Sequence, residues 1–276
     1  YDSITRIRSS LKINMFEFYL FGTNINKSPS PFIHNYVFNY FNKEWIYNLY
    51  STKYLDKLQE IIRRKYFYGA SVTTPFKTSI IRYLDHVSNN SKIIGAINTI
   101  KNNNGVLEGY NTDWLAMYNI TQTLLKKNDS IKSAYVLGNG GTSKAVIFAL
   151  NKLNIKTILF CRNIEKAQKD LLNLDVYSFN NINTLNKSLD TCLLCINCLS
   201  NDVYLDLTIM KDKSYFVNIP YNNNININKN VNIISGYDFL SIQAFYQYCI
   251  WNNINIDINN INEILFNKYN NAINIF

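Results

Sequence analysis

Apolar and polar positions alternate along the first part of this chain in short blocks with the lengths of strands and helices. The block Met15–Phe21 is apolar but too short to span a membrane, and it contains Glu17, so it predicts a strand. Further strands are predicted near 45–50 and 68–73, and helices near 32–41, 53–65 and 77–84. The segments 94–100 and 105–110 predict two strands around an Asn-rich turn. This alternation favours a mostly parallel sheet covered by helices.

The pattern starts afresh after Asp113. The predicted order is a helix, a strand, a glycine turn, a helix and a strand, over 114–126, 133–137, 138–141, 143–153 and 157–160. Such a βαβ unit with glycines at its first junction is typical of dinucleotide-binding folds. The Asn-rich run 222–232 predicts a loop, and helices are predicted over 239–252 and 260–271.

The two patterns predict an α/β protein of two domains, which suits a length of 276 residues. The first is an N-terminal, mostly parallel α/β domain over residues 1–113, to which residues 237–276 return. The second is a Rossmann-like dinucleotide domain over residues 114–236. Residues 1–12 are polar and basic, which is typical of a leader or a linker. Because the chain starts with Tyr1 rather than Met, we expect it to be a piece of a longer polypeptide or an expression product.

Composition restricts the partners. A hydrophobic content of 47% is ordinary for a globular protein. Basic side chains outnumber acidic ones by 28 to 19, a net charge of +9, but the lysines are scattered rather than gathered in a stripe. We therefore expect no nucleic-acid partner. No run of about 18 uncharged apolar residues and no secretory signal is present, so we expect no membrane association and a cytoplasmic location.

Three of the five cysteines have a regular spacing, Cys192-x-x-Cys195-x-x-Cys198. This spacing is similar to part of an iron–sulfur motif, but the fourth cysteine and its proline are missing nearby. The surrounding run 191–199 is apolar, and cysteine behaves as a small hydrophobic residue in such a strand. We predict a buried parallel strand, no metal site, no disulfide framework and a reducing compartment.

The turn Gly138-Asn-Gly-Gly141 lies between a predicted strand and a predicted helix. Glycines let the backbone approach a pyrophosphate, and the helix start offers free N–H groups. The alternative is an ordinary tight turn. After the next strand, Arg162 occupies the region where NAD sites place an acidic residue, and Lys166 follows one turn later. Two basic residues there favour a 2′-phosphate and hence NADP, although a solvated basic helix start has the same pattern.

Lys77 follows the strand near 68–73 and the rigid sequence Thr73-Thr-Pro-Phe76. A positioned lysine can protonate the alkoxide that forms when a ketone is reduced, and Asp113 can hold its ammonium. Lone charged residues usually lie on the surface, but both follow predicted strands, where α/β proteins bind ligands.

The rigid loop Ser28-Pro29-Ser30-Pro31 presents two hydroxyls that can bind a carboxylate. A turn with a helix N-cap explains it equally well. His34 and His86, the two histidines, have no Ser or Cys partner in a motif, which disfavours a hydrolase or a histidine metal site.

Together these segments resemble shikimate dehydrogenase, and most closely the form found at the end of pentafunctional AROM polypeptides. The resemblance covers residues 18–252 and is strongest over 69–144. The matching motifs are Ser28-x-Ser30, Ser71-Val-Thr73-x-Pro-Phe-Lys77, Gly95-Ala-Ile-Asn98-Thr99, Asn111-Thr-Asp113, Gly138-x-Gly140-Gly141-Thr-Ser-Lys-Ala145, Tyr221 and Gly236-Tyr-Asp-Phe-Leu-Ser-Ile-Gln243-Ala244.

The resemblance implies reduction of 3-dehydroshikimate to shikimate with NADPH, in a cleft between two α/β domains. Lys77 and Asp113 would be catalytic. The implied substrate-binding residues are Ser28 and Ser30 for the carboxylate, with Thr73, Asn98, Tyr221 and Gln243 around the ring. The implied cofactor residues are Gly138, Asn139, Gly140, Gly141, Thr142, Arg162 and Lys166.

The cofactor half departs from the family pattern at Cys161, Asn163 and Asn218. Two alternatives therefore remain: a quinate or quinate/shikimate dehydrogenase, which could use NAD, and a non-catalytic shikimate-binding domain of a larger polypeptide.

Overall fold

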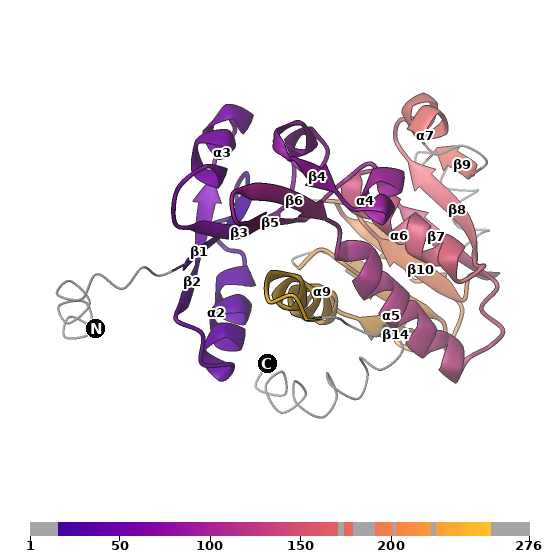
Figure 1. The fold of residues 1–276 in the computed structure, drawn as a ribbon. Coiled ribbons are helices and arrows are strands. Elements are labelled where there is room, and N and C mark those ends of the chain that lie inside the picture. Colours follow the sequence, from indigo (N-terminus) through magenta and orange to yellow (C-terminus); the bar gives the residue numbers. More distant parts are fainter. Residues whose placement is uncertain (1–15, 171–173, 179–190, 201–202, 222–224, 255–276) are drawn as a thin grey trace.

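Two six-stranded sheets organise the part of the chain that the computed structural model describes, residues 16–170, 174–178, 191–200, 203–221 and 225–254 (Figure 1). We call each sheet with its helices a lobe. The first lobe has the strand order β2-β1-β3-β5-β6-β4, and the second has β14-β12-β10-β7-β8-β9. An α/β fold with two mostly parallel sheets is therefore confirmed.

The first lobe alternates strands with short helices. Its strands are β1 (Phe16–Gly22), β2 (Trp45–Ser51), β3 (Phe67–Val72), β4 (His86–Val87), β5 (Thr99–Asn103) and β6 (Val106–Tyr110). Its helices are α2 (Ser30–Tyr40), α3 (Leu55–Ile62), the 3-10 helix η1 (Ser79–Tyr83) and α4 (Asn89–Ile94).

One strand of this sheet runs against the others. β5 is antiparallel to β3 and β6, and Thr99 pairs with both Ser71 and Tyr110. The start of β5 therefore lies at the same sheet edge as the ends of β3 and β6. The segments that carry Lys77, Asn98 and Asp113 leave the sheet at that edge, so this topology brings three distant parts of the sequence together.

The second lobe is a fully parallel sheet. Its strands are β7 (Ser133–Leu137), β8 (Lys156–Cys161), β9 (Asp175–Ser178), β10 (Leu194–Asn197), β12 (Tyr215–Asn218) and β14 (Asn232–Ile234), with the small pair β11 (Leu205–Leu207) and β13 (Ile225–Ile227). Its helices are α5 (Asp113–Lys127), α6 (Gly141–Lys152) and α7 (Ile164–Asp170). The first strand, β7, is central, and the sheet extends to β9 on one side and to β14 on the other. This is the doubly wound order, in which ligands bind where β7 and β10 diverge.

The last helix described, α9 (Gly236–Trp251), lies between α2 of the first lobe and α5 (Figure 1). It starts at a capping box in which Ser235 accepts from the backbone N–H of Asp238 and the Asp238 side chain accepts in return. Its far end inserts the fully buried Trp251 among Phe18 and Phe38. The Trp251 indole N–H donates to the carbonyl of Ile100, 2.9 Å away. The chain thus returns to the first lobe through α9.

Most predicted elements are confirmed. They include the strands near 17–22, 45–50, 68–73, 105–110, 133–137 and 157–160, the buried cysteine strand, and the helices near 32–41, 53–65, 114–126, 143–153 and 239–252. The predicted leader over 1–12 and the predicted helix over 260–271 lie outside the described residues.

Three predictions were wrong. The helix over 77–84 is only the short η1, because the backbone becomes extended at Leu84 and the chain enters β4 at His86. The strand over 94–100 begins only at Thr99, because Ile94 ends α4 and Gly95 takes the left-handed φ of +69° that closes a helix. The loop over 222–232 contains β13, where Ile225 and Ile227 alternate with Asn226 in the period of a strand.

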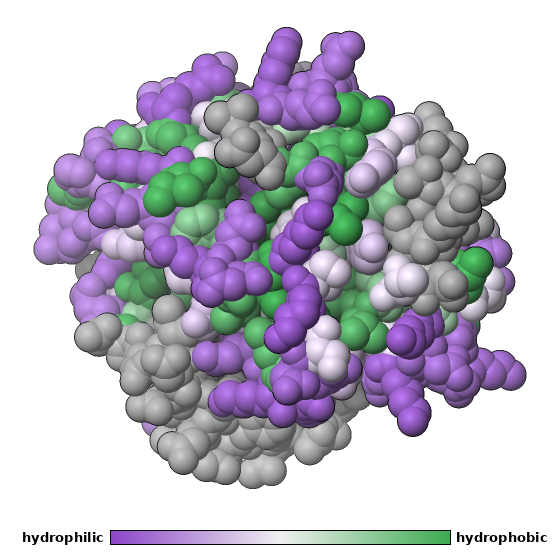
Figure 2. All heavy atoms as spheres, turned by 90° about the vertical axis from the view of Figure 1, so that its right-hand side faces the viewer, coloured by the Kyte–Doolittle hydropathy of each residue, from purple (hydrophilic) through white to green (hydrophobic). Residues whose placement is uncertain are grey.

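No helix among the described residues is long and apolar enough to cross a membrane. Figure 2 shows the face of the molecule that lies at the right of Figure 1. Hydrophilic and hydrophobic residues are interspersed across it.

Gly69 offers a test of how α9 holds the first lobe. A Cβ added there would lie 2.5 Å from the Trp251 indole nitrogen and 3.0 Å from the Ile100 carbonyl oxygen. We expect Gly69→Ala to lower the free energy of unfolding by about 1–3 kcal/mol, because the indole must move and lose its hydrogen bond. Urea unfolding measures this.

The matched control is Gly140→Ala, since a Cβ at Gly140 meets no atom within 4 Å and its φ is an ordinary −79°. Equal stability of the two variants would contradict the packing described for Trp251.

Candidate active site

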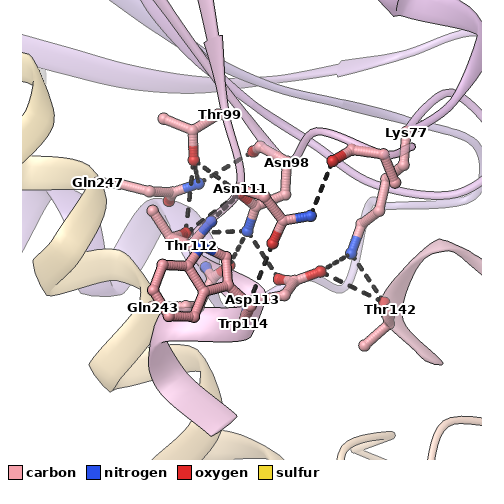
Figure 3. A network of polar contacts seen from close by, with 11 residues as sticks. Lys77, Asn98, Thr99, Asn111, Thr112, Asp113, Trp114, Thr142, Gln243 and Gln247 are labelled. Carbon is pink, nitrogen blue, oxygen red and sulfur yellow. Dashed lines mark hydrogen bonds and ion pairs between the residues drawn. The ribbon is translucent and has the colours of Figure 1, made fainter. Parts of the chain in front are cut away.

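Lys77 and Asp113 form an ion pair at the edge of the first sheet (Figure 3). The Lys77 Nζ lies 2.5 Å from the Asp113 Oδ2, and the two side chains are only 12% and 2% exposed. Asp113 is the first residue of α5, where the positive end of the helix dipole favours a carboxylate. The pair combines a proton donor with a negative charge that holds it in place.

Asn98 holds the other oxygen of this carboxylate. Its Nδ2 donates to the Asp113 Oδ1 at 2.7 Å and to the Gln243 Oε1 at 2.8 Å. Its Oδ1 accepts from the backbone N–H of Thr112 at 2.7 Å and from the Thr99 hydroxyl at 2.8 Å. All five residues are buried. Because both ends of the Asn98 amide are engaged, its orientation is defined, and so is that of the Asp113 carboxylate.

A second buried glutamine supports Asn98 from α9. The Gln247 Nε2 donates to the Asn98 carbonyl at 3.1 Å and to the Thr99 hydroxyl at 3.0 Å. Its Oε1 accepts from Ser71 at 2.8 Å, and Ser71 accepts from the Tyr47 hydroxyl at 2.6 Å. Burial raises the pKa of Tyr47, which keeps this phenol a hydrogen-bond donor. A continuous chain of hydrogen bonds therefore runs from β2 to Asp113.

The two predicted carboxylate-binding serines lie together at the start of α2. The Ser28 hydroxyl donates to the Ser30 hydroxyl at 3.1 Å. The N-cap of α2 is Pro29 and no side chain caps it, so neither serine acts as the cap. Neither hydrogen-bonds to Lys77, Asn98 or Asp113. The structure thus pairs the hydroxyls beside a helix start but does not join them to the ion pair.

Tyr221 and Thr73, the remaining predicted substrate residues, differ in their surroundings. The Tyr221 ring contacts Tyr237 at 5.3 Å between centroids. Burial raises the pKa of Tyr221, and the negative charges of Asp113 and Tyr237 raise it further. Thr73 follows β3, and its methyl group lies against Gly22. The Thr73 hydroxyl makes no hydrogen bond within the described residues.

The predicted cofactor turn follows β7 and faces Lys77. Gly138 has a φ of +100°, and a Cβ there would lie 3.2 Å from the Cys198 carbonyl oxygen, so only glycine suits this position. Gly141 starts α6 against the Lys77 side chain, and the Thr142 hydroxyl accepts from the Lys77 Nζ at 2.8 Å (Figure 3). The side-chain amide of Asn139 donates instead to the Asn163 carbonyl, 3.4 Å away.

These residues fit a dinucleotide. The first turn of α6 leaves backbone N–H groups unpaired, it has no acidic residue, and the space beside Gly140 is open. Arg162 follows β8 and Lys166 lies in the first turn of α7, and both are exposed. Neither forms an ion pair with a carboxylate of the described residues. Both basic side chains are thus available to a phosphate at the same sheet edge.

Two further titratable side chains near the site, His34 and Cys198, are not ionised at neutral pH. His34 is buried and stacks on Tyr47, and burial lowers its pKa to about 3. Burial raises the pKa of Cys198, beside the ion pair, to about 12, so it is no nucleophile. No group of three or more His, Cys, Asp or Glu side chains within the described ranges could hold a metal ion.

No role was predicted for Ser71, Tyr47, Thr99, Thr112 or Gln247. One signal for Gln247 was present. It follows Gln243 by four residues in a helix whose neighbouring positions are apolar or aromatic, so both amides lie on one buried face. Two polar residues at that spacing on an otherwise apolar helix indicate a buried hydrogen-bond network.

Comparison with known proteins gives a consistent result. The profile of the shikimate dehydrogenase substrate binding domain matches residues 20–100. A shikimate dehydrogenase (NADP(+)) of Sulfolobus acidocaldarius is 34% identical over 207 residues, which cover 74% of this chain and 75% of the relative.

A pentafunctional AROM polypeptide of Schizosaccharomyces japonicus is 36% identical over 171 residues, or 60% of this chain. The chain spans about a tenth of the length of that relative, since the match covers 11% of it. The crystal structure of shikimate dehydrogenase from Aquifex aeolicus has a TM-score of 0.74 and 27% identity, over 90% of this chain and 96% of that one.

Gln247→Leu tests the hydrogen-bond chain. Leucine has a similar volume but leaves Ser71, Thr99 and the Asn98 carbonyl short of a partner. We expect the free energy of unfolding to fall by about 2–4 kcal/mol, because buried polar groups without partners cost about 1–3 kcal/mol each. Urea unfolding measures it, with the exposed Gln168→Leu of α7 as the control. A fall in the free energy of unfolding of less than about 0.5 kcal/mol would argue against this chain of hydrogen bonds.

Proposed function

The chain belongs to the shikimate dehydrogenase family, and on that basis we propose that it reversibly reduces 3-dehydroshikimate to shikimate with NADPH. The observation that carries the proposal is the Lys77–Asp113 ion pair facing the glycine turn of the second lobe. A proton donor and a dinucleotide turn on opposite sides of one site are what ketone reduction needs. The Sulfolobus relative, named shikimate dehydrogenase (NADP(+)), supports the same reaction.

Lys77 supplies the proton in this mechanism. NADPH held by the glycine turn after β7 and the start of α6 would supply the hydride for the carbonyl carbon. As negative charge develops on the carbonyl oxygen, the Lys77 ammonium donates a proton to it, so the product is an alcohol. The Lys77 ammonium has three N–H groups. Two of them donate hydrogen bonds to Asp113 and Thr142, and the third is left for the substrate oxygen. In the reverse direction the neutral amine takes the proton back.

The remaining substrate residues orient the ring. The paired hydroxyls of Ser28 and Ser30 bind the carboxylate by two charge-assisted hydrogen bonds. Thr73, Asn98, Tyr221 and Gln243 contact the ring hydroxyls. The free Thr73 hydroxyl can do so directly. Asn98 and Gln243 give up the hydrogen bond between them to bind the substrate.

The cofactor residues are Gly138, Asn139, Gly140, Gly141, Thr142, Arg162 and Lys166, with Thr142 contributing its backbone N–H because its hydroxyl accepts from Lys77. The backbone of the glycine turn and the start of α6 bind the pyrophosphate. Arg162 and Lys166 bind the 2′-phosphate, which gives a preference for NADP over NAD.

The wider setting is also part of the proposal. Residues 1–113 with 237–276 form the substrate domain, and residues 114–236 form the cofactor domain. The five free cysteines suit a reducing compartment such as the cytoplasm. The matches to pentafunctional polypeptides suggest that the chain works as part of a multifunctional polypeptide.

An assay of the purified chain with shikimate and NADP⁺ tests the function. We expect the wild type to form NADPH, followed by its absorbance, and Lys77→Ala to reduce kcat by about 10²–10⁴-fold, the usual contribution of a positioned acid or base. Glu60→Ala, which removes an exposed charge on α3, is the control and should keep the wild-type rate. A wild-type kcat in Lys77→Ala would remove Lys77 from the mechanism.

Two other outcomes would replace the proposed reaction. Faster turnover of quinate than of shikimate in side-by-side kinetics would indicate a quinate/shikimate dehydrogenase. Shikimate binding in calorimetry without NADP(H) binding or turnover would indicate a non-catalytic domain.

Arg162→Ala tests the cofactor preference. We expect KM for NADP⁺ to rise about 10- to 100-fold, the value of one or two charge-assisted hydrogen bonds, while KM for NAD⁺ stays within about twofold. Lys126→Ala removes an exposed charge from the last turn of α5 and serves as the control. An equal rise in KM for NADP⁺ and for NAD⁺ would show that Arg162 does not recognise the 2′-phosphate.

A further inference from the structure

Thr142 joins the two lobes at the ion pair. It belongs to the first turn of α6 in the second lobe, whereas Lys77 follows β3 of the first. Its hydroxyl oxygen accepts from the Lys77 Nζ at 2.8 Å and lies 3.5 Å from the Asp113 Oδ2 (Figure 3). The Lys77 ammonium of the first lobe is thus held between the Asp113 carboxylate, where the chain passes from β6 to α5, and the Thr142 hydroxyl at the start of α6.

Gly141 makes the same connection by packing. A Cβ at Gly141 would lie 3.2 Å from the Lys77 Cβ and 3.3 Å from its Cδ. The methylene stem of Lys77 therefore runs along the start of α6, and the Thr142 hydroxyl meets the end of that stem. Backbone contact at Gly141 and a hydrogen bond at Thr142 restrain successive parts of one side chain.

This arrangement separates the Thr142 hydroxyl from the cofactor. Its oxygen already faces Lys77, whereas the backbone N–H groups of the α6 start remain available for a pyrophosphate. Lysine has four rotatable bonds, and one hydrogen bond to Asp113 leaves the ammonium free to swing about that contact. A second acceptor defines where the remaining N–H points.

We propose that Thr142 is a positioning residue that aims the Lys77 ammonium at the substrate oxygen, and that it does so only while the lobes are together. The proposal rests on the proposed reductase function. It assigns the Thr142 side chain to the proton donor rather than to NADP. Because its partner lies in the other lobe, a separation of the lobes releases Lys77, and proton donation is then coupled to the approach of the cofactor.

Thr142→Val removes the hydroxyl and keeps the shape, and Thr142→Ser keeps the hydroxyl. We expect kcat to fall about tenfold in Thr142→Val, in either direction of the reaction, and Thr142→Ser to recover most of the rate. The Kd for NADP⁺, from calorimetry, should stay within about twofold in both. Thr142→Ala lacks the same hydroxyl but adds no bulk beside α6. We expect it to lose as much kcat as Thr142→Val, which excludes a disturbance of α6 by the valine as the cause.

A wild-type kcat in Thr142→Val and Thr142→Ala would overturn the proposal. So would a Kd for NADP⁺ raised tenfold or more with kcat unchanged, because the hydroxyl would then be a cofactor ligand. A loss of kcat that serine does not restore would also overturn it, since the effect would come from packing.

A measurement without turnover separates this proposal from the proposed reaction. An amine-reactive reagent, with peptide mass spectrometry, reports how fast Lys77 is modified relative to the exposed Lys126. We expect modification of Lys77 to be roughly threefold or more faster in Thr142→Val than in wild type or Thr142→Ser, because the ammonium loses an acceptor. If wild type fails to oxidise shikimate but this difference appears, the reductase function is wrong and the Lys77–Thr142 contact stands. If the difference is absent, the contact does not position Lys77.

Discussion

The site depends on one interaction, the ion pair between Lys77 and Asp113 in a largely buried position. Removing two charges from water costs several kcal/mol per ion, and their attraction offsets that cost only if further hydrogen bonds satisfy them. Asn98 and the start of α5 stabilise the carboxylate, and Thr142 holds the ammonium. A pair placed at such cost is better explained by proton transfer than by stability.

Much of the first lobe can be understood as support for that pair. The antiparallel β5 brings Asn98 to the edge where the chain leaves β3 and β6, so three separate segments meet there. The helix α9 then closes the arrangement from behind. Gln243 and Gln247 reach Asn98 from α9, while Trp251 at its end binds the core of the first lobe. Packing and polar contacts on one helix therefore serve the same site.

The second lobe contributes the proposed cofactor turn and, at Thr142, a direct contact with the proposed proton donor, Lys77. A two-lobed reductase must bring hydride and proton to adjacent atoms at the same time. Direct contact of Gly141 and Thr142 with Lys77 links the position of the proposed donor to the element proposed to bind the cofactor. The proposed proton donor and the proposed cofactor site therefore lie in different lobes, but the position of the donor depends on contacts with the second lobe.

The sequence by itself determined what depends on local chemistry. Strand and helix periodicity located most elements, the glycines marked the turn after β7, and the motifs around Lys77 and Asp113 named the groups now proposed to react. It was misled where local signals conflict with the tertiary context. Asn and Ile alternating in β13 looked like a low-complexity loop, and Gly95 ended a helix inside a predicted strand.

Only the tertiary structure decided which side chains meet. The antiparallel direction of β5, the return of α9 beneath the first sheet and the contact of Thr142 with Lys77 all join residues far apart in the chain. Hydrogen bonds and close packing depend on distances between segments, and those distances are set when the whole chain has folded.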